Sequence, residues 1–288
     1  MYCVAVDIGG TKIAAARIRR GDVPAVIENV TLPTLASAGF DCSLSQVFQA
    51  IDRCLTEDVR AIGICAPGPL NPKTGIVLNP PNLPGWSNVP LAQLVSERYG
   101  RPCRVENDAN AAGLAETMFG AAQGCASVVY VTLSTGIGTG VILNGRVYHG
   151  KNGAAGEGGH VSIAYNGPVC NCGARGCVEA LASGKAWKER GVDPAHLSEA
   201  NLDELARIVS AWLGGIVSLL DPDIIVIGGG MSQIGEPLFR RLRTLVPACT
   251  INQFAGETPI VPAKLASHVG LFGAASVVFS LESDAFLT

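Results

Sequence analysis

Charged residues are scarce in this sequence, and it contains no long block of one sign. They make up 16% of the 288 residues, and the formal net charge is −3 at pH 7. The basic clusters are short, as is typical of solvated faces: Arg17, Arg19 and Arg20 near the start, and Arg240, Arg241 and Arg243 near the end. Nothing in this distribution fits a nucleic-acid-binding patch, so we expect no nucleic-acid partner.

The sequence also has no apolar run long enough to span a bilayer, no low-complexity segment and no long linker. Met1 leads directly into a strand-like segment that lacks the features of a signal peptide. We therefore expect no membrane partner and a cytoplasmic location. Hydrophobic residues make up 48% of the chain, which at this length predicts a globular protein with two domains around a cleft.

Ten cysteines are present, and three of them lie with a histidine in one glycine-rich loop. His160, Cys170, Cys172 and Cys177 fall within 18 residues. Thiolates and a neutral imidazole suit zinc, and four such donors complete a tetrahedron with no open position. We therefore predict a structural zinc site in this loop. The alternative, in which these cysteines pack only as small buried hydrophobes, is weaker for so polar a segment.

Two carboxylates flank this loop. Glu157 lies three residues before His160, and Glu179 lies two residues after Cys177. A closed metal site between them would hold the loop in place, and we predict that the two carboxylates then accept hydrogen bonds from a hydroxyl-rich ligand. The segment 79–86, NPPNLPGW, is rigid, polar and aromatic, and it fits either the wall of a small-molecule cleft or an ordinary connector.

Glycine is abundant, with 35 residues, and it gathers in turns after apolar, strand-like segments. The first turn joins predicted strands over 2–7 and 12–18, and the second follows a predicted strand over 127–133. Glycines let backbone N–H groups approach an anion, and Asp7 stands where a hydrated Mg²⁺ could be held. The repeated plan predicts a nucleotide clamped from both sides. A third turn, at 228–230, would let the backbone pass close to a nucleoside.

Polar residues crowd together where a predicted strand over 103–106 gives way to a predicted helix over 109–119. Asp108 stands near the start of this helix, where the helix dipole favours its charged form. An aspartate there is also a common N-cap. The crowding of Glu106, Asn107 and Asn110 around it exceeds what capping requires, so Asp108 is a candidate general base in a cleft.

With these motifs assembled, the chain resembles the ROK family of sugar kinases, within the actin-like ATPase superfamily. The resemblance covers nearly the whole chain and rests on DIGGTK, ENDANAA, STGIGTG, GEGGH, CNCGARGC and IGGG. It implies an α/β, actin-like (ribonuclease H-like) fold of two domains with the active site in the cleft between them. The first domain would span 1–108, with a closing helix over 271–288 packed back on it. The second would span 109–270 and carry the zinc loop.

The resemblance also implies a role for each motif. Asp108 would be the base that takes a proton from a sugar hydroxyl, which then attacks the γ-phosphate of ATP, with Mg²⁺ as cofactor. The sugar would be bound by Asn107, Asp108, Glu157, His160 and Glu179, with help from Gly68 and Asn82. The nucleotide and its metal would be held by Asp7, Gly9, Gly10, Thr11, Lys12, Thr135 and Gly136, with Gly228 and Gly229 at the adenosine. Zinc would be ligated by His160, Cys170, Cys172 and Cys177.

Several alternatives stay open at this point. Glucose is the favoured substrate, because NPPNLPGW followed by ENDANAA is similar to glucokinases, but a kinase of N-acetylmannosamine or N-acetylglucosamine would keep nearly every motif. A sugar-sensing transcriptional regulator of the same family is a different class, although Tyr2 already begins the first strand and leaves no room for a helix-turn-helix domain. A zinc module that binds protein partners would leave the paired glycine turns unexplained. The family resemblance further implies a homodimer or homotetramer.

Two departures from the family pattern lead to further expectations. Gly158 stands where the family usually has a bulky apolar residue, so we expect a looser wall beside Glu157. The segment 184–202 is shorter than usual, which affects the expected adenine side and the subunit contacts. Around this segment, apolar spacing predicts helices over 179–190 and 202–220.

Overall fold

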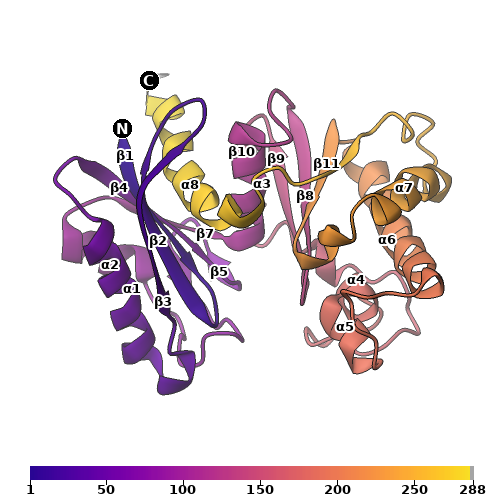
Figure 1. Ribbon diagram of the computed structural model, residues 1–288, viewed down its shortest axis with the longest axis horizontal. Coiled ribbons are helices and arrows are strands. Elements are labelled where there is room, and N and C mark those ends of the chain that lie inside the picture. Colours follow the sequence, from indigo (N-terminus) through magenta and orange to yellow (C-terminus); the bar gives the residue numbers. More distant parts are fainter. Residues whose placement is uncertain (286–288) are drawn as a thin grey trace.

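The computed structural model describes residues 1–285 and is built on two five-stranded sheets (Figure 1). The first sheet has the order β3-β2-β1-β4-β7. Its strands are β1 (Tyr2–Ile8), β2 (Lys12–Arg19), β3 (Ala25–Pro33), β4 (Val59–Ala66) and β7 (Cys103–Asn107). Strands β1, β2 and β3 are antiparallel neighbours, whereas β4 runs parallel to both β1 and β7.

The second sheet repeats this plan with the order β10-β9-β8-β11-β12. Its strands are β8 (Ser127–Leu133), β9 (Ile137–Leu143), β10 (Arg146–Val147), β11 (Ile224–Gly228) and β12 (Ile260–Pro262). Again the first three strands are antiparallel, and β11 runs parallel to both β8 and β12. A small hairpin of β5 (Leu70–Asn71) and β6 (Ile76–Val77) extends from the first half. The predicted internal duplication is therefore present.

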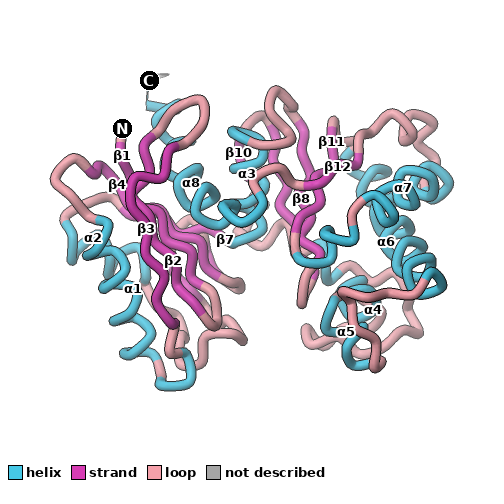
Figure 2. The backbone as a smooth tube through the Cα atoms, in the orientation of Figure 1, coloured by secondary structure: helices cyan, strands magenta, loops and turns pink. Residues whose placement is uncertain are grey.

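Helices cover both faces of each sheet. The central pair, α3 (Asp108–Phe119) and α8 (Val269–Ala285), pack against each other between the sheets, with α3 on β8 and β9 and α8 on β1 and β4 (Figures 1 and 2). The outer face of the first sheet carries α1 (Phe40–Cys54) and α2 (Leu91–Tyr99). The outer face of the second carries α4 (Val178–Ala182), α5 (Gly184–Glu189), α6 (Glu199–Leu220) and α7 (Glu236–Leu245).

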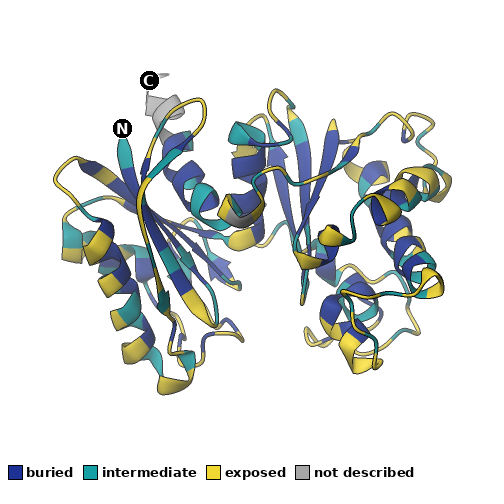
Figure 3. Cartoon of the chain, viewed as in Figure 1, coloured by how far each residue is buried: buried dark blue, intermediate teal, exposed yellow. Residues whose placement is uncertain are grey.

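This layering explains why the central strands read as continuous apolar runs. In β1, Val4 and Val6 pack into the core beneath α1, whereas Cys3 and Ala5 pack on the opposite face against α8. Strands buried on both faces lose the alternation of apolar and polar residues. Figure 3 shows the buried residues concentrated in the two sheets and on the helix faces that cover them.

The structure corrects the predicted helix over 179–190, which is two short helices. Ser183 ends α4 and caps α5, because its side chain accepts a hydrogen bond from the Ala186 amide. The Gly184 amide donates to the Ser134 carbonyl oxygen at 2.7 Å, which ties the break to the second glycine turn. The predicted helix over 202–220 begins earlier, at Glu199, with Ser198 as its cap.

The predicted closing helix over 271–288 corresponds to α8, whose last three predicted residues lie outside the described residues. Within residues 1–285, no helix combines the length and apolar character that a membrane crossing requires. We propose a domain boundary at Asp108, since that residue begins α3, which covers the second sheet, whereas α8 returns to the first.

Candidate functional site

The carboxyl ends of three neighbouring parallel strands bring acidic side chains together. In the register of β1, β4 and β7, Asp7 lies beside Cys65, and Cys65 lies beside Glu106. Asp108 follows directly as the first residue of α3. Ligand sites in α/β sheets form at such strand ends, in the crevice that the connections leave open.

Asn107, rather than Asp108, caps α3. Its side-chain oxygen accepts from the amides of Ala109 at 2.9 Å and Asn110 at 3.4 Å. Asp108 accepts from the Ala109 amide at 2.8 Å through Oδ1. Asn107 therefore performs the capping role that the sequence also allowed for Asp108. The Asp108 carboxylate lies in the first turn of the helix.

The surroundings of Asp108 suit a base that must take up a proton. Its side chain is open to solvent in the crevice, although protein atoms on both sides displace much of the bulk water. This desolvation raises the pKa of Asp108 to about 6; the Ala109 hydrogen bond opposes the rise, and the charges of Asp7 and Glu157 add to it. Burial likewise raises the pKa of Asp7, while Lys12 counteracts the rise. A base whose pKa lies near neutral pH is favourable for proton transfer.

Residues from both halves of the chain line the crevice around Asp108. Gly68 and Asn107 contribute from the first sheet, and Gly156 and Glu157 from the loop after the second hairpin. A Cβ atom on Gly68 would lie 3.2 Å from Asn107 Nδ2 and 3.9 Å from Glu157 Oε1. Thus Gly68, Asn107 and Glu157, to which the family resemblance assigns the same ligand, lie together at one place.

Thr139 holds the backbone on both sides of Glu157. Its buried hydroxyl donates to the Gly156 carbonyl oxygen and accepts from the Gly158 amide at 2.9 Å. The expectation of a looser wall at Gly158 is wrong. A Cβ there would lie 2.6 Å from Thr139 Oγ1 and 3.3 Å from Trp212 Cζ2, so these two side chains already fill the space.

Glu179 is placed by the second glycine turn. It lies in the first turn of α4, and its Oε2 accepts from the Ile137 amide at 2.9 Å. A Cβ on Gly136 would lie 2.7 Å from the same oxygen. Only glycine at 136 lets the carboxylate approach this closely, so Glu179 reaches the edge of the turn predicted to bind phosphate.

The four predicted zinc ligands come together. One ligand atom from each of His160, Cys170, Cys172 and Cys177 can be chosen so that all lie within 4.8 Å of one another. Cys170 Sγ is 3.6 Å from His160 Nδ1, and Cys172 Sγ is 3.6 Å from Cys177 Sγ. Zn–S bonds of about 2.3 Å in a tetrahedron place two sulfurs about 3.8 Å apart. The donors and their spacing therefore fit a zinc ion.

The glycine turns lie where the duplicated fold predicts them. The third turn packs against β8, the first strand of the second glycine hairpin. A Cβ on Gly228 would lie 2.4 Å from the Tyr130 hydroxyl, and one on Gly229 would lie 2.3 Å from the Leu133 carbonyl oxygen. In the first turn, a Cβ on Gly10 would lie 3.0 Å from the Asn82 carbonyl oxygen. Asn82 therefore adjoins the first turn rather than the crevice lining around Asp108.

The remaining predicted nucleotide residues also lie at these turns. Thr11 and Lys12 are exposed beside Gly9, and the Thr135 carbonyl oxygen accepts from the Lys185 amide at 3.1 Å.

The segment 79–86 is anchored in the core of the first half of the chain. The side chains of Leu83 and Trp86 are fully buried, and Trp86 Nε1 donates to the Ser43 hydroxyl.

Sequence reasoning did not assign roles to three residues that shape the site: Thr139, Glu106 and His149. Glu106 Oε2 lies 2.6 Å from His149 Nε2, and its Oε1 accepts from the amide of Asn107. The acidic crowding before α3 signalled Glu106, but no local pattern in the sequence marks its partner, 43 residues away.

The two sheets have equivalent strand orders, and a polar crevice lies at their strand ends. This arrangement is the predicted actin-like ATPase fold. Within that class the chain belongs to the ROK family, whose model matches residues 3–280. The predicted resemblance is thus confirmed.

Several relatives match almost the whole chain. A glucokinase of Thermotoga maritima is 34% identical over 311 aligned positions, covering 96% of each chain. The crystal structure of a ROK hexokinase from Thermus thermophilus has a TM-score of 0.82 and 34% identity, covering 99% of this chain and 100% of that one. That of a ROK glucokinase from Streptomyces griseus in complex with glucose and AMPPNP has a TM-score of 0.79 and 31% identity, covering 96% and 99%.

Other relatives correspond to the alternatives. An N-acetylmannosamine kinase of Haemophilus influenzae is 31% identical, covering 96% of this chain and 94% of its own. A xylose repressor of Bacillus subtilis is 32% identical, covering 75% of this chain and 60% of its own. The repressor match therefore leaves a large part of the repressor unmatched, unlike the kinase matches.

Proposed function

We propose that this chain is an ATP-dependent hexose kinase and that glucose is its first candidate acceptor. The observation that carries the proposal is the crevice in which the Asp108 carboxylate, with its raised pKa, faces Glu157 from the other half of the fold. Relatives that are glucokinases over their full length support it, as does the glucose and AMPPNP bound to the Streptomyces griseus enzyme.

In the proposed reaction, Asp108 accepts the proton of a sugar hydroxyl. The hydroxyl oxygen forms a bond to the γ-phosphorus of ATP while the bond from that phosphorus to the β–γ bridging oxygen breaks, and ADP leaves. Such transfer depends mainly on positioning and on stabilisation of charge. The other sugar hydroxyls would be bound by Asn107, Glu157, His160 and Glu179, with Gly68 beside them. Asn82 would contribute from its place at the first glycine turn.

The nucleotide would lie along the glycine turns. Gly9, Gly10, Thr11, Lys12, Thr135 and Gly136 would surround the phosphates, and Gly228 and Gly229 would line the adenosine pocket. Mg²⁺, held as a hydrated ion near Asp7, would supply neutralisation of the phosphate charge. Burial raises the pKa of Asp7 and the positive charge of Lys12 opposes the rise, and a bound cation would favour the charged carboxylate further.

We propose a structural role for zinc at His160, Cys170, Cys172 and Cys177. Four protein donors leave no position for a substrate atom. His160 faces Cys170 through Nδ1, so its Nε2 would remain for a sugar hydroxyl. A closed site would brace the loop between Glu157 and Glu179 and thereby place both carboxylates.

The test of this function is an ADP-release assay with Mg-ATP and purified protein. Glucose, mannose, fructose, N-acetylmannosamine and N-acetylglucosamine are compared as acceptors, with no sugar as the blank. We expect glucose to give the highest kcat/KM. A higher kcat/KM for N-acetylmannosamine would move the substrate to the second candidate, and the absence of sugar-dependent ADP release would refute the kinase proposal.

A transcriptional regulator remains the candidate of a different class, because xylose repressors are among the relatives. The regulator would bind a sugar without sugar-dependent ADP release, so the same assay separates the two. We also propose a cytoplasmic location. We further propose a homodimer or homotetramer, and light scattering of the purified protein would test this oligomeric state.

The pH dependence of turnover follows from the pKa of Asp108, which desolvation raises to about 6. A general base is inactive when protonated, so kcat/KM for the sugar should fall as pH decreases through about 6, by about tenfold per unit below it. The measurement is initial rates from pH 5 to 9 at saturating Mg-ATP. Calorimetric sugar binding over the same range is the control, and a rate that stays flat down to pH 5 would contradict the assignment.

A further inference from the structure

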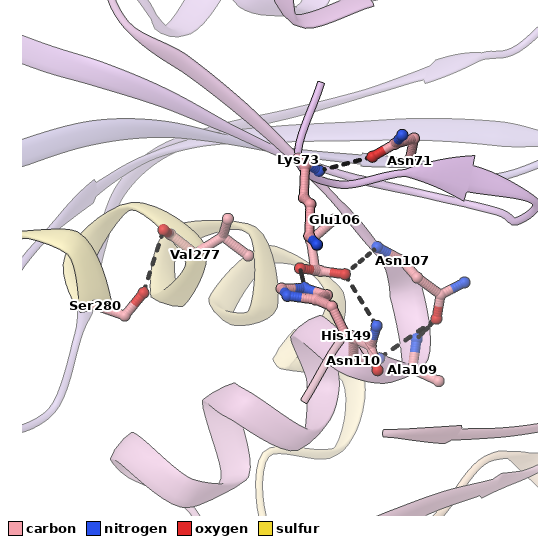
Figure 4. A network of polar contacts seen from close by, with 9 residues as sticks. All are labelled: Asn71, Lys73, Glu106, Asn107, Ala109, Asn110, His149, Val277 and Ser280. Atoms are coloured by element: carbon pink, nitrogen blue, oxygen red, sulfur yellow. Dashed lines mark hydrogen bonds and ion pairs between the residues drawn. The ribbon is translucent and has the colours of Figure 1, made fainter. Parts of the chain in front are cut away.

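One buried carboxylate joins the helix that carries Asp108 to the segment that carries Glu157. Glu106 is 4% exposed at the end of β7. Its Oε1 accepts from the Asn107 amide at 2.9 Å and from Asn110 Nδ2 at 3.0 Å (Figure 4). Both donors belong to the cap and first turn of α3, so one oxygen is used to fix the start of that helix.

The other oxygen of Glu106 points to the opposite side. Its Oε2 lies 2.6 Å from His149 Nε2, as Figure 4 also shows. A carboxylate accepts hydrogen bonds, so the imidazole donates from Nε2. His149 stands eight residues before Glu157, and its carbonyl oxygen accepts from the Ala155 amide at 3.1 Å. The contact therefore fixes the start of the segment 149–157.

The same segment contacts the first half of the chain at two further points. Lys73 Nζ donates to the Lys151 carbonyl oxygen at 2.9 Å, and a Cβ on Gly153 would lie 2.9 Å from Pro72 Cδ. The first contact is exposed and involves a flexible lysine side chain, and the second is van der Waals packing. The pair of Glu106 and His149 is the deeper connection, since the carboxylate is buried and both of its oxygens are used.

The inner side of this network holds one acceptor without a donor. Asn110 Oδ1 is buried and has no hydrogen-bond partner among the described residues, and it lies 3.3 Å from the position of a Cβ on Gly156. A buried acceptor without a partner costs free energy. The start of α3 and the segment before Glu157 are therefore in close contact, although no described donor forms a hydrogen bond to Asn110 Oδ1.

We propose that Glu106 and His149 are positioning residues that set the spacing between the Asp108 carboxylate and Glu157. This inference rests on the proposed kinase function, in which Asp108 accepts the proton and Glu157 binds the sugar. With one oxygen on α3 and the other on His149, Glu106 makes the two sides of the sugar site move as one unit. Glu106 also lines the crevice, but both of its oxygens are engaged in these contacts, so the pair would act through the placement of Asp108 and Glu157.

The test is His149→Ala in the full chain. Thr139 still holds the far end of the segment in this variant, so we expect kcat/KM for the sugar to fall by about tenfold, through both a higher KM for the sugar and a lower kcat. The KM for ATP should change much less, because no hydrogen bond among the described residues joins Glu106 or His149 directly to the glycine turns proposed to hold the phosphates. His149→Gln, whose amide can donate to Glu106, should recover most of the lost kcat/KM.

His196→Ala is the matched control. His196 also pairs with a carboxylate, Asp193 at 2.8 Å, but on an exposed connector away from the crevice. It should leave all kinetic constants unchanged. If His149→Ala lowers only the melting temperature, with kcat and both KM values as in the wild type, the pair is structural and the proposal fails.

Amide hydrogen exchange gives a readout that does not depend on turnover. In His149→Ala, amides across residues 150–158 should exchange faster than in the wild type, because the start of the segment is released. Unchanged exchange there would overturn the proposal. A wild-type protein that releases no ADP with any sugar would instead refute the kinase function, and the exchange experiment would then decide the positioning role alone.

Discussion

Asp108→Asn should lower kcat by a factor of about one hundred to ten thousand, the usual contribution of a positioned general base. The amide keeps the size of the side chain and can keep accepting from the Ala109 amide, but it cannot take up the proton of the sugar hydroxyl. Asn107 continues to cap α3, so the local backbone does not depend on the charge at 108. Sugar affinity should therefore change much less than turnover.

The measurement is steady-state ADP release together with calorimetric sugar binding in the absence of nucleotide. Asp22→Asn, at an exposed turn between β2 and β3, is the matched control and should have wild-type kinetics. If Asp108→Asn retains turnover within tenfold of the wild type, Asp108 is not the base. If the variant instead loses sugar binding altogether, Asp108 acts mainly as a ligand of the sugar.

The same substitution has a consequence for stability. The pKa of Asp108 in the folded protein, about 6, lies above its ordinary value of 3.8, so the folded state binds more protons than the unfolded state between these pH values. Stability then decreases as pH rises through this range. Because the amide does not ionise, Asp108→Asn should be at least as stable as the wild type at pH 8. A thermal melt at pH 5 and pH 8 checks the sign.

The candidate site residues that local sequence patterns located have partners that are close in the chain. The three thiols and His160 lie within one loop, and Asn107 and Asp108 lie at one junction. Short spacing largely determines geometry there. The repeated glycine hairpins also indicated an internal duplication, which the structure shows as two sheets with equivalent strand orders.

The residues that sequence missed or misjudged depend on partners from distant segments. Nothing near Gly158 indicates that Trp212, from α6, fills the space beside it. The break between α4 and α5 likewise reflects the bond from the Gly184 amide to Ser134, which no helical periodicity reveals. Apolar spacing reports which face of a helix is buried, but not what lies opposite that face.

The fold joins the proposed sugar site to both halves of the chain. Glu157 is held by Thr139 from β9 and, through His149, by Glu106 from β7. Glu179 is held by the amide of Ile137 at the second glycine turn. In a two-domain kinase that closes around its substrate, such links would let sugar binding bias closure before the phosphates react.

If zinc occupies the site that we propose, its loss should weaken sugar binding before it affects ATP. Cys172→Ala removes one of the four donors of the predicted site while leaving the buried thiols of Cys170 and Cys177 in place. Metal binding of this kind contributes directly to folding of the loop. Without it, the connection between Glu157 and Glu179 loses its brace, and misplacement of a binding group by about 1 Å can cost about one hundredfold in rate.

We therefore expect Cys172→Ala, or chelator-treated wild type verified as metal-free by elemental analysis, to lose about one hundredfold in kcat/KM for the sugar, with a KM for ATP near that of the zinc-loaded protein. Cys42→Ala, which removes an exposed thiol at α1, is the matched control and should retain both zinc and activity. The two carboxylates approach the site from either side of the loop, whereas the first glycine turn lies in the other sheet, so the effect should be selective. Unchanged sugar affinity in a metal-free sample would show that the fold places Glu157 and Glu179 without zinc. An equal loss for sugar and ATP would instead indicate that the loop supports the whole second half of the chain.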